Sequence, residues 1–512
     1  MLNSKSAKEL GGLGSLLLLT TTLCGQDKPN ILFIMSDDHA ANAVSAYGGD
    51  LSKVLKTRNI DAISKNGAIL YSCFATNSIS TPSRATILTG QYSHKNGVYT
   101  LSDKMDTTKQ TVAGILQKSG YSTALFGKWH LVTEPKGFDT YACLIGQGIY
   151  NNPPLIESNR TDGKSFENSK GKKYIGHCED IIADRTIKWL SEERDKSKPF
   201  FVMCHFKAPH RRWEPAERYS HIFDNVTIPE PSNLYDNYEG RGRYTSRILQ
   251  AIEYMDSSDM KMPIPKFSSV SEQRKWAYQR YMKDYLGCVA GVDDNVGKLV
   301  KYLKDNNLYD NTIVIYTSDQ GFFLGEHGWF DKRLMQEESI KMPFVISFPK
   351  EIKPGTKNRD ITINADFAPT LLDYAGVDIP EDMQGKSFRD NLKGKRAKDW
   401  RKSMYYRYYM HMDYWHHSVA NLGVRTNRYK LIFYYGDPLG TKGSFGPAFE
   451  PEWELYDLKR DPKEMNNLYN KPGYEKITKE LKEELLRLRR ELGDNDDTGG
   501  RMKEIMDNYY NK

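Results

Sequence analysis

Alternation of short apolar runs with helical patterns, from residue 30 to about residue 348, constrains the fold of this chain most strongly. Such alternation is typical of a sheet with helices on both faces. Ligands of open α/β sheets bind beyond the carboxyl ends of the strands. The polar ends of four of the runs are therefore predicted to meet at one site; these ends are residues 36–39, 127–130, 207–210 and 318–321.

The length of 512 residues exceeds one ordinary domain, so a large α/β domain with a smaller second one is expected. The boundaries are placed at 26–390 for the catalytic domain, 391–495 for an α+β subdomain and 496–512 for a tail. Hydrophobic residues make up 39% and charged residues 27%. No apolar run after the N-terminus approaches the roughly 20 residues of a membrane span, so the mature chain is expected to be soluble.

The texture of the sequence changes after residue 376. Aromatic-rich runs at 403–409 and 429–435 predict a small antiparallel sheet, and a Gly/Pro-rich stretch at 436–451 follows them. A charged helix over 475–492 closes the subdomain, and the tail from Gly493 is expected to be mobile.

The N-terminus has the order of a secretory signal peptide, predicted over residues 1–25. Lys5 and Lys8 precede an apolar stretch at 13–23, although Glu9 weakens the positive end. Export to the periplasm or the medium is therefore expected. Lipid attachment to Cys24 is the alternative, which Leu23 disfavours because a smaller residue usually precedes such a cysteine.

Six cysteines lie far apart without a C-x-x-C pair, so they form no zinc or redox motif. Removal of a leader through Cys24 leaves five, and buried free thiols are the expected state. The formal net charge is +7 and the pI about 8.7. This excess suits a polyanionic substrate without identifying one, and no nucleic-acid partner is expected.

The sharpest motif is the string from Ser80 to Arg84, Ser-Thr-Pro-Ser-Arg, followed by Gly90. Pro82 suits the first turn of a helix and Gly90 its end, which places Ser80 at a helix N-terminus where anions are favoured. A plain N-cap serine is the structural alternative. The whole string resembles the signature of the sulfatase family, in which this Cys or Ser becomes formylglycine (3-oxoalanine). Gln91 departs from the basic residue that is common there.

The resemblance extends along most of the chain. It includes an opening strand and metal loop at 30–38, a Gly-Lys-Trp-His segment within 111–131, a second metal loop at 311–326 and a C-terminal signature within 456–467. It implies an alkaline phosphatase-like α/β fold with a large, mixed but mostly parallel sheet flanked by helices, followed by a smaller C-terminal antiparallel sheet plus helix.

A calcium site is predicted at the strand ends. Asp37, Asp38, Asp319 and the amide oxygen of Gln320 are the hard oxygen donors that Ca²⁺ prefers. If these carboxylates only capped loops, several like charges would be crowded without compensation. By resemblance, the modified Ser80 completes the ligands of one Ca²⁺ per chain.

The resemblance also implies a division of catalytic labour. Hydrated formylglycine at position 80 attacks sulfur while Arg84, Lys128 and Lys332 neutralise charge. His210 protonates the leaving sugar oxygen, alone or with Lys332, and His130 takes the proton from the second hydroxyl. Serine forms are matured by an oxygen-independent radical enzyme, which implies a bacterial source and modification before export.

The segment around Asp331, Lys332 and Arg333 resembles bacterial N-acetylglucosamine-6-sulfatases, in which an Asp-Lys-Arg triplet is typical. Asp331 and Arg333 are predicted to bind sugar hydroxyls, and a mutual surface ion pair is the alternative. The expected substrate is a 6-O-sulfated N-acetylglucosamine or glucosamine in a glycosaminoglycan or mucin-type glycan. Another sulfated position, such as iduronate-2-sulfate or galactosamine sulfate, is the second hypothesis.

Two hypotheses come from other classes, a phosphomonoester or phosphonate hydrolase of the same superfamily and a catalytically silent glycan-binding module. The full Ser80 signature and intact candidates at each catalytic position argue against both. His39 and His94 lie near the motifs and are given no role. The cluster of His411, Trp415, His416 and His417 is also left unassigned, because it either reaches the site from the second domain or forms part of the core or rim.

Overall fold

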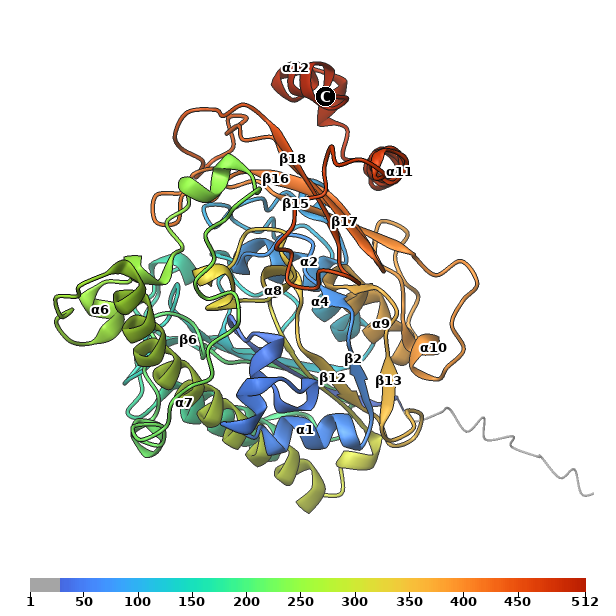
Figure 1. Ribbon diagram of the computed structural model, residues 1–512. Helices are drawn as coiled ribbons and strands as arrows, with labels where there is room; N and C mark the ends of the chain where they lie inside the picture. Colours follow the sequence, from blue (N-terminus) through green and yellow to red (C-terminus); the bar gives the residue numbers. More distant parts are fainter. Residues whose placement is uncertain (1–27) are drawn as a thin grey trace, which may run out of the picture.

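The computed structural model describes residues 28–512. The predicted signal peptide, with Cys24, therefore lies outside the described residues. A ten-stranded sheet forms the centre of the molecule, with a four-stranded sheet beside it (Figure 1).

The ten strands lie in the order β13-β2-β12-β9-β1-β8-β4-β5-β6-β7. The five central strands run parallel to one another; they are β9 (Thr312–Ser318), β1 (Asn30–Ser36), β8 (Phe200–His205), β4 (Ser122–Lys128) and β5 (Thr140–Leu144). On one side, β12 (Phe344–Ser347) pairs antiparallel with both β9 and β2 (Ala68–Leu70), and β13 (Thr356–Asn358) pairs parallel with β2. On the other side, β6 (Pro154–Glu157) pairs antiparallel with both β5 and β7 (Lys172–Lys173). The predicted mixed, mostly parallel sheet is confirmed.

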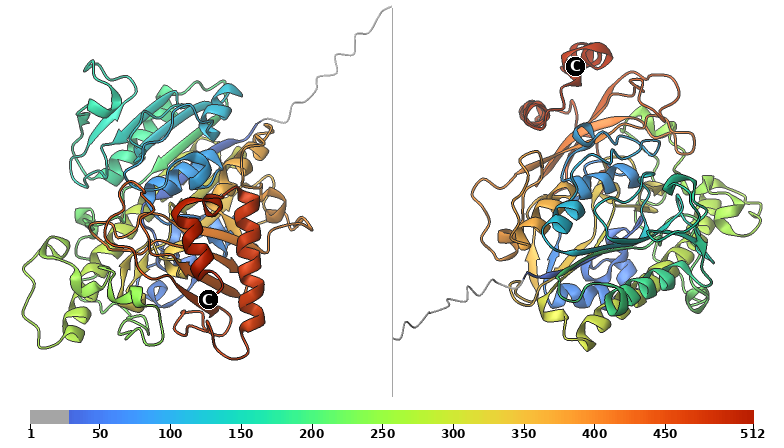
Figure 2. Two further views of the ribbon diagram at one scale, coloured as in Figure 1. Left: turned by 90° about the horizontal axis from the view of Figure 1, so that it is seen from above. Right: turned by 180° about the vertical axis from the view of Figure 1, so that it is seen from behind.

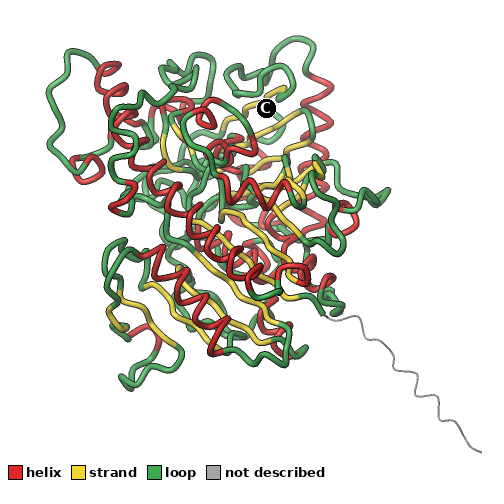
Figure 3. The backbone as a smooth tube through the Cα atoms, turned by 90° about the horizontal axis from the view of Figure 1, so that it is seen from below, coloured by secondary structure: helices red, strands yellow, loops and turns green. Residues whose placement is uncertain are grey.

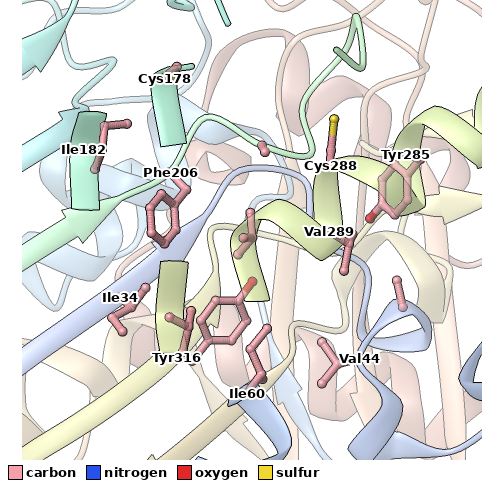
Figure 4. Packing of buried hydrophobic residues seen from close by; sticks show 14 of the residues in the cluster. Ile34, Val44, Ile60, Cys178, Ile182, Phe206, Tyr285, Cys288, Val289 and Tyr316 are labelled. Carbon is pink, nitrogen blue, oxygen red and sulfur yellow. The ribbon is translucent and has the colours of Figure 1, made fainter. Parts of the chain in front are cut away.

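Both faces of this sheet are covered, which explains why its strands are apolar at successive positions rather than alternating. Along β1, Leu32 and Ile34 belong to one hydrophobic cluster, whereas Ile31 and Phe33 belong to the cluster on the other face. Figure 4 shows the first cluster, where Ile34 and Tyr316 of the strands meet Ile60 and Val289 of the helices.

Helices α1 (Arg58–Lys65), α5 (Cys178–Lys188) and α7 (Val270–Asp305) cover one face. In the view from below, helices lie across the strands of the large sheet (Figure 3). The other face is covered by α2 (Ser80–Thr89), α4 (Val112–Lys118) and α9 (Phe367–Tyr374). The shorter elements are α3 (Ser93–Asn96), α6 (Ser257–Met260), α8 (Glu337–Ile340), α10 (Arg389–Leu392), β3 (Cys73–Phe74), β10 (Phe323–Leu324), β11 (Phe330–Asp331) and β14 (Thr362–Ile363).

Helix α7 runs unbroken from Val270 to Asp305, although its first half is rich in charged and polar residues. The Ser269 side chain caps the start by accepting a hydrogen bond from the Glu272 amide at 3.1 Å. In the first half of the helix, the side chains of Tyr278 and Tyr281 are buried. These two positions are three residues apart, the spacing of one helix face, and charged residues surround them in the sequence.

The C-terminal sheet is antiparallel, as predicted, and consists of β15 (Ser403–Tyr408), β16 (Asn421–Thr426), β17 (Tyr429–Tyr434) and β18 (Glu452–Asp457). Helix α11 (Glu475–Leu492) packs against it and matches the predicted charged helix. Both C-terminal helices lie on the side of this sheet that faces away from the large sheet (Figures 1 and 2).

The tail is not the mobile segment that the sequence suggested, because it contains helix α12 (Gly500–Tyr509). Met502 and Ile505 are each 2% exposed, and the Tyr510 ring packs 5.1 Å from that of Trp453. The buried positions 502, 505, 506 and 510 follow a helical period, a pattern short enough to be missed at a chain end.

The described helices include none that is both long and apolar enough to cross a membrane. The five cysteines within residues 28–512 are unpaired and buried, as expected, and burial raises the pKa of each thiol.

Candidate functional site

The four polar strand ends meet because β9, β1, β8 and β4 are neighbours in the sheet and run parallel. Asp37 and Asp38 follow β1, Lys128 ends β4, and Asp319 follows β9. The backbone amide of Asp38 donates to Oδ1 of Asp319 at 3.2 Å. A single polar centre therefore lies at the carboxyl edge of the sheet.

Ser80 is the first residue of α2, and its Oγ donates to Oδ1 of Asp37 at 3.1 Å. Pro82 lies in the first turn, and Gly90 ends the helix in a left-handed conformation with φ 66°. The Ser83 hydroxyl donates to the Asp319 carbonyl and accepts from Asn364 at 2.9 Å. These contacts aim the amino end of α2, and Ser80 with it, at the carboxylates.

Arg84 joins three strand ends from the same helix. Its Nε donates to Oδ2 of Asp319 at 3.1 Å, and its Nη1 donates to the Lys128 carbonyl at 2.7 Å. Its Nη2 lies 3.7 Å from Oδ2 of Asp37. The side chain is 2% exposed, so this guanidinium is a fixed positive charge inside the site.

Two lysines oppose the carboxylates. Lys128 forms an ion pair with Asp37, and burial lowers the Lys128 pKa to about 8. The Nζ of Lys332 donates to both oxygens of Asp38 at 2.6 and 2.7 Å. Burial alone would lower the Lys332 pKa, but Asp331 and Asp38 outweigh it and raise that pKa. Lys332 therefore remains charged.

Asp37, Asp38 and Asp319 are fully buried. Burial, together with the neighbouring carboxylates, raises the pKa of Asp38 to about 7 and that of Asp319 to about 6. Burial also acts to raise the pKa of Asp37, but the charges led by Lys128 hold it well below its usual value. Carboxylates packed this closely without water need positive charge to be stable.

A divalent cation fits these donors. The Nε2 of Gln320 donates to Asp38, whereas its buried Oε1 has no hydrogen-bond partner. An amide oxygen left free beside three carboxylates is the hard-oxygen donor set of Ca²⁺. Asp37, Asp38 and His210 also offer atoms within 4.8 Å of one another. His210 thus borders the same cluster, although the sequence assigned it to proton transfer.

Both candidate histidines lie at this edge. The His130 carbonyl accepts a hydrogen bond from the Thr81 hydroxyl at 3.0 Å, and its buried Nδ1 has no partner. The Nε2 of His210 lies 3.8 Å from Oδ2 of Asp38, and its Nδ1 is held by the Arg211 carbonyl. Burial, reinforced by Lys128, keeps the pKa of both well below the usual value. Neutral imidazoles here can accept and pass protons.

Asp331 and Arg333 flank Lys332 with positive φ angles of 77° and 91°, and their side chains form an ion pair. They are 4% and 3% exposed, so this is a buried pair rather than the surface pair of the alternative interpretation. The Nε of Arg333 lies 3.4 Å from Oδ2 of Asp413, and Nε2 of His416 lies 3.1 Å from Oδ2 of Asp331. His416 and Asp413 are joined by a 2.8 Å contact.

Sequence reasoning singled out His416 only as part of an unassigned cluster and missed Asp413 entirely. The structure separates that cluster, because the His411 ring contacts the Ala420 amide and the Pro447 carbonyl instead. The sequence did contain one signal for this pair, because Asp413 lies three residues before His416 in a segment rich in aromatic residues. Neither His39, whose Nδ1 contacts Tyr316, nor His94, whose Nε2 lies 2.8 Å from the Leu492 carbonyl, contacts the carboxylates at 37, 38 and 319.

One further residue of the site, Gln147, belongs to none of the predicted motifs, and it contacts Lys128 and also Lys207 of the predicted polar end at 207–210. The Nζ of Lys128 donates to Oε1 of Gln147 at 2.6 Å, and the buried Lys207 donates to the Gln147 carbonyl at 3.2 Å. Gln147 lies in the loop after β5, and the pairing of Lys128 with Leu144 brings that loop alongside. The register of two adjacent strands, rather than any local pattern, places it.

Two protein-family models match the chain. A model described as "Sulfatase" matches residues 29–377, and a model described as "N-sulphoglucosamine sulphohydrolase, C-terminal" matches residues 325–491. The two matches together extend from the first strand through most of α11. They overlap at the segment that contains Lys332.

Named relatives are similar over most of the chain. An N-acetylglucosamine-6-O-sulfatase of Bacteroides thetaiotaomicron is 43% identical, covering 92% of this chain and 88% of that protein. The human N-acetylglucosamine-6-sulfatase is 28% identical, covering 77% of this chain and 70% of that protein.

Among solved structures, a protein in complex with its substrate D-glucosamine-2-N,6-O-disulfate has a TM-score of 0.84 and 41% identity. The match covers 92% of this chain and 99% of that chain. A phosphonate monoester hydrolase of Agrobacterium radiobacter has a TM-score of 0.71 at 22% identity, covering 91% and 96% of the two chains, and shares the fold.

Proposed function

The chain belongs to the sulfatase family, and we propose that it hydrolyses the 6-O-sulfate ester of N-acetylglucosamine or glucosamine at the end of a glycosaminoglycan or mucin-type glycan. The observation that supports this choice of substrate is the buried Asp331–Arg333 pair beside Lys332. A carboxylate and a planar guanidinium make directional hydrogen bonds to neighbouring sugar hydroxyls. Similarity to two N-acetylglucosamine-6-sulfatases supports the same sugar.

Ser80 is proposed to be oxidised to formylglycine. When hydrated, this aldehyde supplies a nucleophile for sulfur and a second hydroxyl through which sulfate is released. The position supports the proposal, because residue 80 is buried at the amino end of α2 and directed at Asp37. A helix N-terminus favours the negative charge that develops there.

Asp37, Asp38, Asp319 and Gln320 would hold one Ca²⁺ together with the modified residue 80. The ion would polarise a sulfate oxygen and offset the crowded carboxylates. The free Oε1 of Gln320 supports this assignment, because a buried amide oxygen without a partner is costly unless a cation occupies its lone pairs.

The cationic side chains bind the sulfate group. Arg84, Lys128 and Lys332 approach the carboxylate cluster from α2, β4 and the loop after β11. Their three directions suit the equatorial oxygens of a sulfate in the transition state. Because Arg84 and Lys128 are buried and held by fixed partners, they need little rearrangement when the charge appears.

The two histidines divide the proton transfers. His210, which lies beside Asp38 and is partly exposed, is proposed to protonate the departing sugar oxygen, alone or with Lys332. His130, next to α2, is proposed to take the proton from the second hydroxyl of residue 80. The lowered pKa of His130 leaves that imidazole neutral and ready to accept a proton. Burial lowers the pKa of His210 as well, so His210 must be protonated before it can act as the acid, and the negative charge of the bound sulfate ester favours that protonation.

Residence in the periplasm or outside the cell is proposed, after export directed by residues 1–25. A serine-type radical enzyme is the proposed maturation partner, acting on the unfolded segment around Ser80 before export. The burial of Ser80 in the folded protein supports this order, because a side chain that is 2% exposed is more accessible to a second enzyme before the chain folds.

The test compares sulfate release from 6-sulfated N-acetylglucosamine, 2-sulfated uronate, and 4- and 6-sulfated N-acetylgalactosamine. Release from the first alone supports the proposal, and turnover of only another sugar rejects it in favour of the second hypothesis. Mass spectrometry of the Ser80 peptide from active protein checks the modification, which removes two hydrogens. Finding unmodified serine in active protein, or faster cleavage of a phosphonate monoester, would instead support the phosphonate hydrolase alternative.

A further inference from the structure

The turn that carries Asp413 and His416 also presents two large aromatic side chains to solvent. Tyr414 is 71% exposed and Trp415 is 72% exposed, which makes Trp415 the most exposed tryptophan of the described residues. Large exposed aromatic side chains side by side are unusual on a soluble protein surface and mark binding sites. Their rings lie 5.0 Å apart at 87°, so one flat face of each stays free.

The turn is rigid. The His417 amide donates to the Asp413 carbonyl at 3.0 Å, and the amides of Trp415 and His416 both donate to Oδ1 of Asp413 at 3.2 Å. The Met412 amide donates to the Ser418 carbonyl at 2.6 Å, which closes the base of the turn. The backbone that carries the aromatic pair is therefore ordered by its own hydrogen bonds, and an ordered turn lowers the entropic cost of binding a ligand.

The same turn contacts Asp331 and Arg333, the pair proposed to bind the sugar. Trp415 is directly followed by His416, whose ring contacts Asp331, and is preceded by Asp413, which contacts Arg333. The His416 carbonyl also accepts from the Leu249 amide at 2.7 Å. Tyr414 and Trp415 therefore lie, in the chain, between the two residues that contact Arg333 and Asp331.

We propose that Tyr414 and Trp415 form a subsite for the unsulfated sugar next to the one that carries the sulfate. The C–H face of a pyranose ring is apolar and matches the face of an indole or phenol ring. Two side chains are far smaller than the roughly 800 Å² per partner of a stable protein interface, so a sugar suits the patch better than a protein does. This inference rests on the proposed function.

The test uses Trp415→Leu and Trp415→Phe, a matched pair in which only the second keeps a flat ring. The substrates are 6-sulfated N-acetylglucosamine as a monosaccharide and a trisaccharide with that sugar at its non-reducing end. For the trisaccharide, we expect Trp415→Leu to raise KM about fivefold, equivalent to about 1 kcal/mol of stacking, and Trp415→Phe to raise it less than twofold. The KM for the monosaccharide should be unchanged in both variants.

An unchanged trisaccharide KM in Trp415→Leu overturns the proposal. An equal rise for both substrates also overturns it, because it means that the turn only supports Asp331. Loss of a co-purifying protein without a change in KM assigns the patch to a protein partner instead.

Binding of the desulfated trisaccharide to Ser80→Ala protein, measured by calorimetry, separates this inference from the proposed function. Weaker binding in the Trp415→Leu background supports the subsite even if the wild type cleaves no 6-sulfated sugar. Equal binding in both backgrounds rejects the subsite even if the wild type is a 6-O-sulfatase.

Discussion

The Nε2 of His416 lies 3.1 Å from Oδ2 of Asp331, across 85 residues of sequence. The imidazole also contacts Asp413 through Nδ1 at 2.8 Å, so it links two carboxylates that both contact Arg333. The loop between β15 and β16 thus completes the group around Lys332.

His416 is expected to orient Asp331 for the sugar, so His416→Ala should weaken substrate binding more than turnover. We expect KM for the 6-sulfated monosaccharide to rise about tenfold, equivalent to about 1.4 kcal/mol, with kcat changed less than threefold. His417→Ala in the same turn, without an ion pair to Asp331, is the control and should leave KM unchanged. A loss confined to kcat in His416→Ala would place the residue in the chemistry instead.

Calcium is expected to stabilise the folded protein through Asp37, Asp38 and Asp319. Calorimetry of chelated protein should show a melting temperature that rises as Ca²⁺ is added, with a gain of about 2.7 kcal/mol at a hundredfold excess over Kd. Asp319→Ala should abolish the rise. Asp310→Ala, just before the opposite end of β9, should keep it; an equal rise in both variants argues against the predicted ligands.

The buried carboxyl group of Asp293, which lies away from the carboxylate cluster, is expected to make the free energy of unfolding depend on pH. Burial raises its pKa to about 6, despite hydrogen bonds from the amides of Asn59 and Ile60. Its contribution is thus fully present below the unfolded pKa of about 4 and is lost as pH rises through 6. Asn at position 293 cannot ionise, so Asp293→Asn should gain about 3 kcal/mol relative to wild type between pH 4 and pH 7. Urea unfolding across this range measures it, and a flat difference contradicts the expectation.

Helix α12 is expected to contribute to stability rather than to activity. Ile505 is 2% exposed, so Ile505→Ala should cost about 2–5 kcal/mol of unfolding free energy, whereas Lys503→Ala on the outer face should cost less than about 0.5. Urea unfolding compares the two, and kcat should be unchanged in both. Equal stability of the variants would restore the expectation of a mobile tail.

The sequence by itself determined the alternating elements, the polar strand ends and the position of Ser80 in α2. These depend on local patterns, such as apolar runs of strand length, and Pro82 and Gly90 at the two ends of a helix. Parallel strands bring their carboxyl ends to one edge, so the meeting of Asp37 with Lys128 and of Asp38 with Asp319 followed from the fold class. The domain boundaries and the catalytic roles remain predictions.

Only the tertiary structure decided which residues surround the triplet and which serve packing. Gln147 reaches Lys128 through the register of β5 on β4, and His416 reaches Asp331 through the packing of the C-terminal sheet. The first half of α7 and the whole of α12 form because tertiary burial stabilises weak helical patterns. Contacts between residues distant in sequence depend on how whole elements pack, and a local pattern holds no information about that packing.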